Sequence, residues 1–131
     1  MFAEITSKIN RYIIANSVLD EIKSTLRFPE MGGILGSNTN KIITDYHHDI
    51  TGQTTARNYT PDINKLNNVI LQWHLHGIEF IGFVHSHSAY KKTLSLVDIR
   101  YAEKIKRCCG LTEILMLLFI PNDQSFHQYI I

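Results

Sequence analysis

Hydrophobic positions recur along the chain with two different periods. A period of about 3.6 residues predicts helices, and a period of about 2 residues predicts strands. Three stretches follow good capping residues, and after the first of these, Ser17, apolar residues recur every four positions on one helical face. Asp20 resembles a capping-box partner of Ser17, while Pro61 suits the first helical position after Thr60. The predicted helices run from Ser17 to about Leu26, from Thr60 to about His76 and from Ser95 to about Gly110.

Segments rich in β-branched and aromatic residues lie between these helices and predict strands. The turn-prone residues 37–40 separate two of these strands and indicate that they pair, whereas the polar stretch from His47 to Thr60 is predicted to be a loop. Strands and helices interleave without a linker, so we expect one domain over residues 1–131, of α/β or α+β class, with helices covering a central sheet. The predicted strands are Ile9–Ala15, Gly32–Ser37, Lys41–Tyr46, Phe80–His87, Glu113–Ile120 and Ser125–Ile131.

Composition narrows the class of protein further. The 131 residues are 44% hydrophobic and 19% charged, which suits a globular core and argues against disorder. A formal net charge of +1 gives no electrostatic reason to expect nucleic acid or an anionic membrane as partner. No apolar run approaches the roughly 20 residues of a membrane helix, and the amino terminus does not resemble a signal peptide. Cys108 and Cys109 are neighbours, a poor disulfide scaffold, and we expect them buried at a helix end in a cytoplasmic protein.

The segment that carries chemistry begins with His85 and His87. Alternation on a strand places both imidazoles on one face, where two such side chains can converge on one ion. Seven residues later, Ser95 and Asp98 share one face at the start of a predicted helix. Two imidazoles and one carboxylate suit Zn²⁺, with a fourth position left for water, which is the arrangement of a catalytic zinc site.

Water at such a site becomes a useful nucleophile when a base takes its proton, and Glu30 has the most suggestive surroundings of the glutamates. It immediately precedes the glycine-rich strand that begins at Gly32, where the backbone can approach a ligand closely. The full set of glutamates comprises Glu4, Glu21, Glu30, Glu79, Glu103 and Glu113.

These residues resemble the signature of the JAMM (MPN-plus, or Mov34/MPN/PAD-1-type) zinc metalloproteases. That signature is an upstream glutamate, then His-x-His, seven residues, Ser, two residues and Asp. The chain matches it at every spacing with Glu30, His85, His87, Ser95 and Asp98, and the order of predicted elements agrees over most of the chain. A lone His-x-His would be weak, but the complete pattern is specific.

The resemblance implies a role for each of these residues. His85, His87 and Asp98 would bind zinc, Glu30 would act as general base on the water, and Ser95 would donate a hydrogen bond to the oxyanion. The implied reaction is hydrolysis of a peptide or isopeptide bond, typically at the carboxyl-terminal tail of a ubiquitin-like or sulfur-carrier-like protein. The implied fold is a mixed sheet flanked by helices, similar to cytidine deaminases.

The chain departs from the family pattern at two positions. Many members carry prolines where Ser88 and Leu94 stand here, and their loss should loosen the intervening loop. This affects loop order and turnover rather than metal binding. The chain also has little room for the loops with which eukaryotic members hold ubiquitin, so it resembles a minimal, prokaryotic-type member.

Simpler interpretations exist for each site residue. His85 and His87 could be an ordinary hydrogen-bonding pair, Glu30 a solvated carboxylate in a turn, and Ser95 a helix cap whose hydroxyl is used by its own helix. The spacing favours the metal site over these alternatives.

The remaining histidines are expected not to bind metal. His74 and His76 form a second His-x-His, but residues two apart at a helix end point in different directions. We expect His47 and His48 to be solvated on alternating faces and His127 to be structural. Several basic residues near the site are expected to form a solvated face, or alternatively to guide an acidic partner surface: Lys91, Lys92, Arg100, Lys104, Lys106 and Arg107.

Two rival functions remain open on the sequence. One is a non-catalytic, metal-stabilised interaction module, like the scaffold members of the family. The other is a deaminase, which would need His-x-Glu and Pro-Cys-x-x-Cys segments that the sequence lacks. The apolar end, Tyr129–Ile131, could close the sheet or lie in a subunit interface.

Overall fold

The fold is built on a five-stranded sheet with the strand order β10-β9-β8-β3-β5. Strands β8 and β9 run parallel and the other neighbours run antiparallel, so the predicted α+β architecture with a mixed central sheet is confirmed. The computed structural model describes residues 2–4, 12–27, 30–38, 42–54, 59–89 and 93–131. The strands of this sheet are β3 (Gly32–Ser37), β5 (Asp45–His48), β8 (Glu79–Ser86), β9 (Leu115–Ile120) and β10 (Ser125–Ile130).

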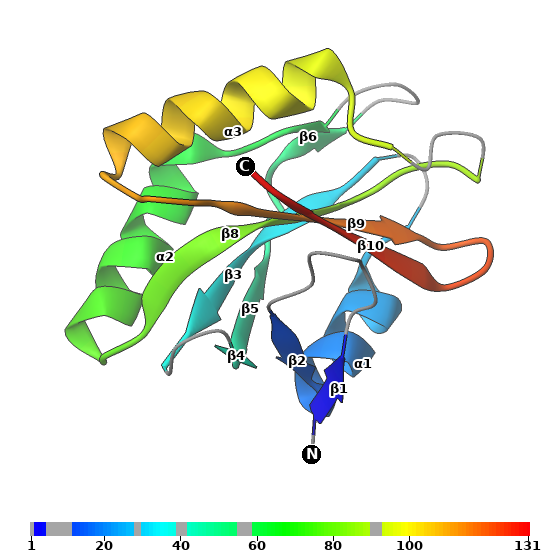
Figure 1. Cartoon of the computed structure of the whole chain (residues 1–131), viewed down its shortest axis with the longest axis horizontal. Coiled ribbons are helices and arrows are strands. Elements are labelled where there is room, and N and C mark those ends of the chain that lie inside the picture. The colour runs from blue at the N-terminus through cyan, green and yellow to red at the C-terminus, as the bar shows by residue number, and fades with distance from the viewer. Residues whose placement is uncertain (1, 5–11, 28–29, 39–41, 55–58, 90–92) are drawn as a thin grey trace.

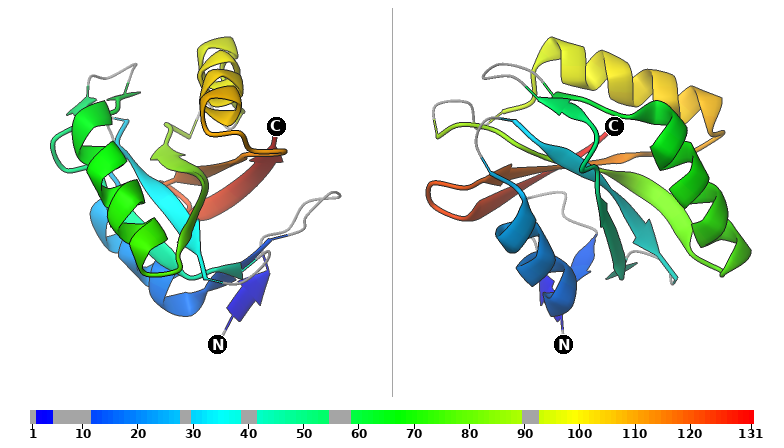
Figure 2. Two further views of the ribbon diagram at one scale, coloured as in Figure 1. Left: turned by 90° about the vertical axis from the view of Figure 1, so that its left-hand side faces the viewer. Right: turned by 180° about the vertical axis from the view of Figure 1, so that it is seen from behind.

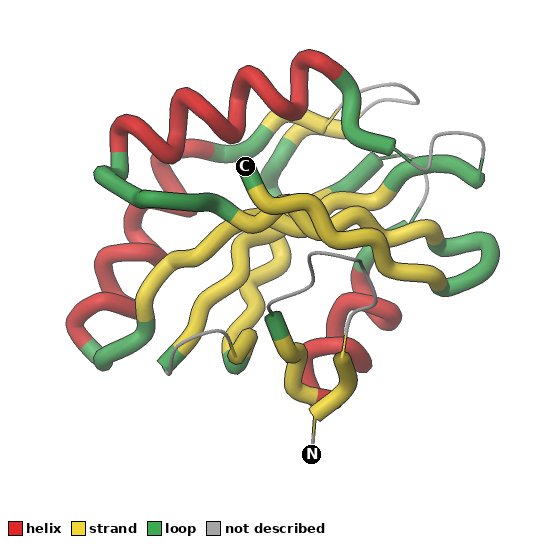
Figure 3. The backbone as a smooth tube through the Cα atoms, viewed as in Figure 1, coloured by secondary structure: helices red, strands yellow, loops and turns green. Residues whose placement is uncertain are grey.

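Three helices in the described residues surround this sheet, with α3 along the top of Figure 1, α2 at the left and α1 below. Their bounds are α1 (Asn16–Thr25), α2 (Ile63–Leu75) and α3 (Leu96–Cys108). Figure 2 shows the same arrangement from the side and from behind, and Figure 3 separates helices from strands by colour. No helix of the described residues is long and apolar enough to cross a membrane.

The core has two halves, one on each face of the sheet. Val84 on β8 packs with the buried residues of α1, whereas its neighbour Phe83 packs with those of α2 and α3. The central strands β3 and β9 are buried along their whole length, which explains their nearly continuous apolar sequences. Alternation along β8 therefore sends His85 and His87 to the face covered by α2 and α3, as it does Phe83.

Two further sheets revise the strand predictions. The predicted strand Lys41–Tyr46 is divided: β4 (Ile42–Ile43) pairs with β2 (Ile13–Ala15), and β5 pairs with β3. The predicted loop from His47 to Thr60 is wrong in part, because its first two residues belong to β5. Later parts of the same stretch form β6 (Gln53–Thr54) and β7 (Tyr59–Thr60), which pair with each other, while β1 (Phe2–Glu4) pairs with β2. The start of the predicted strand Ile9–Ala15 lies outside the described residues.

The helix starts were predicted with unequal success. Helix α1 begins right after β2 with Ala15 at the N-cap position and no side-chain cap, so the expected capping box at Ser17 is wrong. Helix α2 is capped by Asp62 rather than Thr60, because the Asp62 side chain accepts the Lys65 amide and Thr60 lies in β7. Only α3 begins where predicted, at Ser95.

Cys108 and Cys109 were expected to be buried, and this is wrong: both thiols are free and exposed. Cys109 lines an open cavity of about 380 Å³ between α2, the start of β8 and the end of α3. The apolar packing at this end of α3 is supplied instead by Ile105 and Leu111. The Cys109 thiol is partly shielded from solvent, and this partial burial raises its pKa, with a further contribution from the neighbouring Cys108.

Candidate metal centre

His85 lies near the carboxyl end of β8 and His87 directly after it, one residue beyond the observed end of the strand, and their side chains meet on one face of the sheet, as alternation predicts. Their Nε2 atoms are 3.0 Å apart, and both residues are buried, at 5% and 2% exposure. A hydrogen bond between these nitrogens requires that one of them carries a proton. Two nitrogen atoms that could bind a metal ion thus lie side by side in a site largely closed to solvent.

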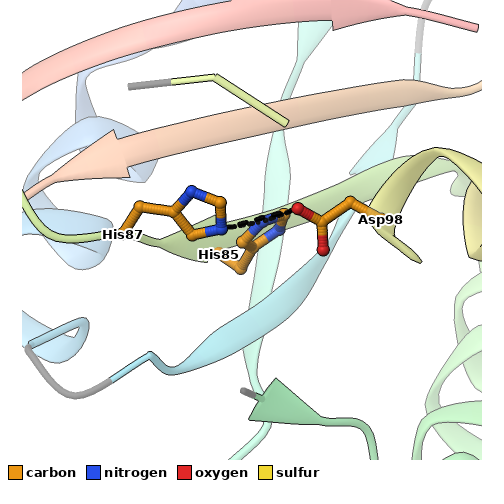
Figure 4. Close-up of side chains that lie close together, drawn as sticks. All are labelled: His85, His87 and Asp98. Carbon is orange, nitrogen blue, oxygen red and sulfur yellow. Dashed lines mark hydrogen bonds and ion pairs between the residues drawn. The ribbon is translucent and has the colours of Figure 1, made fainter. Parts of the chain in front are cut away.

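Asp98 approaches these imidazoles from the first turn of α3 (Figure 4). Its Oδ2 lies 3.4 Å from Nε2 of His85 and 3.5 Å from Nε2 of His87. The three residues can each offer one ligand atom, and these atoms all lie within 4.8 Å of one another. Among the described residues this is the one group of histidine, cysteine and acidic side chains with such geometry.

A capping box fixes the position of Asp98. Its Oδ2 accepts the Ser95 amide at 2.9 Å, while its own amide donates to Ser95 Oγ at 3.1 Å. Burial raises the pKa of Asp98, but the neighbouring His85 and the bonds from Ser95 outweigh burial and hold the pKa below its ordinary value. Asp98 is therefore a carboxylate at neutral pH, the protonation state that a metal ligand requires.

Glu30 comes to the same site from the segment between α1 and β3. Its Oε1 lies 2.8 Å from Nε2 of His87, and the residue is 6% exposed. The simpler interpretation of Glu30 as a solvated carboxylate is therefore wrong. The upstream glutamate of the sequence pattern thus lies within hydrogen-bond distance of His87, one of the three residues expected to bind metal.

Ser95 serves as the N-cap of α3, as the simpler interpretation proposed. Its Oγ accepts the Asp98 amide, which uses an oxygen lone pair and not the hydroxyl hydrogen. The cap therefore uses the oxygen of the Ser95 hydroxyl, whereas donation of a hydrogen bond would use its hydrogen. Of the two loop positions without proline, Leu94 packs partly buried against the core half under α2 and α3, and Ser88 is half-buried.

The other histidines lie apart from this cluster. His74 and His76 are exposed and contact different partners, the Glu79 carboxylate at 3.0 Å and the Gln72 carbonyl at 2.7 Å. His127 contacts Ser125 Oγ at 3.0 Å on β10.

His47 and His48 were expected to be solvated, but both are half-buried because β5 pairs with β3 through them. The Nε2 atom of His48 is buried with no hydrogen-bond partner among the described residues. Of the basic residues near the site, Arg100, Lys104 and Arg107 are exposed, as a solvated face requires, and Lys106 is half-buried. The expected members Lys91 and Lys92 lie outside the described residues.

Sequence reasoning missed Ser86, which lies between the two histidines and is fully buried. Its side chain contacts the segment that carries Glu30. Alternation along β8 could have indicated this residue. A residue between two histidines that share one face of the sheet must point to the opposite face, which is buried as well.

The donor set fits a zinc ion. Two imidazole nitrogens and one ionised carboxylate are ligands that Zn²⁺ prefers, and three protein ligands are the usual number in catalytic zinc sites. His85, His87 and Asp98 could hold such an ion, because their ligand atoms converge and are largely shielded from solvent.

No protein-family model matches the sequence, and no curated protein is detectably similar to it. Among solved structures, the fold is similar to the solution structure of protein DSY2949 from Desulfitobacterium hafniense, a structural-genomics target. The two chains are 16% identical, with a TM-score of 0.64 over 89% of this chain and 80% of that chain. A likeness at this identity supports the architecture and assigns no activity.

Proposed function

We propose that the chain is a zinc-dependent peptidase or isopeptidase with a JAMM/MPN domain related in fold to cytidine deaminases. One observation carries the proposal: the His85, His87 and Asp98 ligand atoms converge within 4.8 Å, and the Glu30 carboxylate lies 2.8 Å from His87. Glu30 thus lies beside three residues that follow it by more than 50 positions, and these four are residues of the JAMM signature.

His85, His87 and Asp98 would hold the metal. A bound zinc ion would supply Lewis-acid chemistry, which makes water more acidic and polarises a carbonyl group. The capping box holds Asp98 in α3, His85 lies in β8 and His87 directly follows that strand, so the three ligands lie in or next to regular secondary structure. Ligands on rigid elements are positioned more accurately than ligands on loops.

Glu30 would act as general base and then as general acid. Its buried carboxylate is next to the ligand cluster, within reach of a proton on a nucleophile bound there. The same carboxyl group can carry that proton to the leaving amine, so one side chain would serve both halves of the reaction.

Ser95 would stabilise the oxyanion. Its Oγ accepts a bond within the cap, so its hydroxyl hydrogen can be directed towards the charge that develops on the substrate carbonyl. Ser95 is the residue immediately before α3, and Asp98 lies in the first turn of that helix. Ser95, which would contact the substrate, and Asp98, which would bind the metal, would therefore both be positioned by the start of α3.

The substrate that best fits this site is the carboxyl-terminal tail of a ubiquitin-like or sulfur-carrier-like protein in the cytoplasm. Leu96 and Val97 support a protein partner, because these apolar side chains are 60% and 70% exposed between Ser95 and Asp98. An apolar surface beside a reactive site suits contact with a second protein.

The test combines metal content with cleavage. Elemental analysis of the tag-free protein should find about one zinc per chain. Mass spectrometry of a panel of ubiquitin-like fusions, each with a short peptide or an isopeptide-linked lysine after the tail, should then identify a cleaved member. Asp98→Ala should lose both zinc and cleavage.

Two outcomes would contradict the proposal. Zinc content near zero, even after zinc is added, would rule out the metal centre. Full zinc content without cleavage of any fusion, together with stoichiometric recovery of one partner in a pull-down, would support the non-catalytic interaction module instead.

A further inference from the structure

Ser86 occupies a special position on β8, between the two histidines of the cluster. It is fully buried, and alternation directs its side chain to the face opposite His85 and His87. Buried hydroxyl groups are costly unless they form hydrogen bonds, so the partners of this side chain indicate its role.

Those partners lie on both sides of Glu30. The Ser86 hydroxyl donates to the Arg27 carbonyl at 2.8 Å and accepts the Met31 amide at 2.9 Å. The Ser86 amide donates to the Met31 carbonyl at 2.8 Å. A longer contact of 3.4 Å joins the same hydroxyl to that Met31 carbonyl. Both backbone groups of Met31 are thus bonded to one residue of β8.

These contacts close a ring of covalent and hydrogen bonds. Ser86 is bonded to Met31, Met31 follows Glu30 in the chain, Oε1 of Glu30 lies 2.8 Å from His87, and His87 follows Ser86. The general base and the ligand strand therefore have few ways to move relative to each other. Strand register contributes as well, since Gly32 lies opposite His85 where β3 pairs with β8.

We propose that Ser86 is a positioning residue that holds the Glu30 carboxylate against the metal centre. This inference rests on the proposed function for its effect on catalysis, but the positioning itself is a property of the protein with or without activity. Ser86 does not face the site, so it acts only through Glu30. A displacement of about 1 Å in a catalytic group can lower the rate about 100-fold.

The test compares Ser86→Ala with Ser86→Thr, which retains a hydroxyl group. Tyr12→Phe is the matched control, because it removes another partly buried side-chain hydrogen bond, the 2.9 Å bond from Tyr12 to Glu113. Two readouts use the full-length, metal-free protein at constant pH: hydrogen exchange of the Met31 amide and the nitrogen chemical shifts of the His87 imidazole. Two more use the zinc-loaded protein: zinc content, and kcat and KM on a cleaved fusion.

In Ser86→Ala we expect the Met31 amide to exchange at least about 10-fold faster and the His87 shifts to move towards those of Glu30→Gln. With zinc content and KM unchanged, kcat should fall about 100-fold. Ser86→Thr should recover most of each effect, whereas Tyr12→Phe should change none of them. If Ser86→Ala does not fold, Ser86→Cys, whose thiol is a weaker donor, should give a smaller change in the same directions.

Wild-type His87 shifts and wild-type Met31 exchange in Ser86→Ala would overturn the positioning role. A loss of zinc parallel to the loss of kcat would also overturn it, because the defect would then lie in the ligand strand. A wild-type protein that cleaves no fusion would contradict the proposed function alone, since the two measurements on the metal-free protein still decide whether Ser86 positions Glu30.

Discussion

The chain contains two His-x-His segments, and they behave in opposite ways. His85 and His87 extend from a strand to the same face, with their Nε2 atoms 3.0 Å apart and both residues buried. His74 and His76 lie at the end of α2, where both are exposed and each contacts a separate partner. The same three-residue pattern thus gives one convergent pair and one divergent pair.

The difference shows that the secondary structure decides whether the pattern can bind metal. Two positions on a strand repeat the side-chain direction, whereas two positions on a helix rotate it by about 200°. Each pair also has a glutamate, Glu30 for the strand pair and Glu79 for the helix pair, at 2.8 Å and 3.0 Å. Among the described residues, only the strand pair has a second carboxylate, that of Asp98, within reach of both rings.

The largest expected difference between the pairs concerns zinc content. His87→Ala should lose the bound zinc, because only two ligands remain, while His76→Ala should keep about one zinc per chain. Elemental analysis of both purified variants measures this directly. Equal zinc loss in both, or in neither, would remove the distinction between the pairs.

The two glutamates provide the next comparison. Glu30→Gln should retain zinc and lower kcat about 1000-fold, because an amide cannot take up the proton. Glu79→Gln should leave zinc content and kcat unchanged, since Glu79 lies at the start of β8, far from the cluster, and both it and its partner His74 on α2 are exposed. Steady-state kinetics on a cleaved fusion, with zinc measured in the same samples, distinguishes the two. An active Glu30→Gln variant would mean that another group is the base.

The N-cap residues of α3 and α2 provide a third comparison, for which the expected effect is smaller. Ser95→Ala should lower kcat about 100-fold if its hydroxyl stabilises the oxyanion, and should cost about 1 kcal/mol of unfolding free energy as a lost cap. Asp62→Ala removes the cap of α2 and should lower stability without any effect on kcat. Urea denaturation and kinetics on both variants measure the two effects. Equal kcat values in Ser95→Ala and wild type would restrict Ser95 to capping.

The smallest expected effect comes from His48, a half-buried histidine that belongs to neither pair. Burial lowers the pKa of His48 from 6.5; Asp49 opposes this shift and His47 adds to it. The unfolded chain therefore binds a proton at a higher pH than the folded chain, so the folded state loses stability as the pH falls below about 6.5. His48→Gln should show a smaller decrease in unfolding free energy between pH 7.5 and 5 than wild type. Parallel decreases in urea denaturation would show that His48 does not contribute.

The sequence predicts best the features that depend on neighbouring residues. Alternation places His85 and His87 together, and the helix start predicted at Ser95 is confirmed, with Ser95 as its cap. Strands β9 and β10 also begin and end within two residues of their predicted bounds. Such features follow from local backbone geometry, which the sequence specifies directly.

The errors arise where distant residues compete for the same backbone groups. The chain leaves β4 at Thr44, whose amide bonds to the Gly36 carbonyl, and no local signal predicts this change of sheet. Asp62 becomes the cap of α2 while its own amide donates to Asp49, a residue 13 positions away. The surroundings of Glu30 before the glycine-rich strand and the family pattern both indicate it as the base, but nothing local predicts its contact with His87 across the intervening chain.

The capping box of α3 has a consequence for reversibility. Asp98 is held by Ser95 and by the two histidine rings, and these contacts involve only the protein. A chelator should therefore remove the metal without unfolding the domain, in contrast to zinc fingers, whose folding requires the ion. Far-ultraviolet circular dichroism after EDTA treatment should be unchanged, and added zinc should restore activity at once. Such a protein could be switched on and off by zinc supply alone.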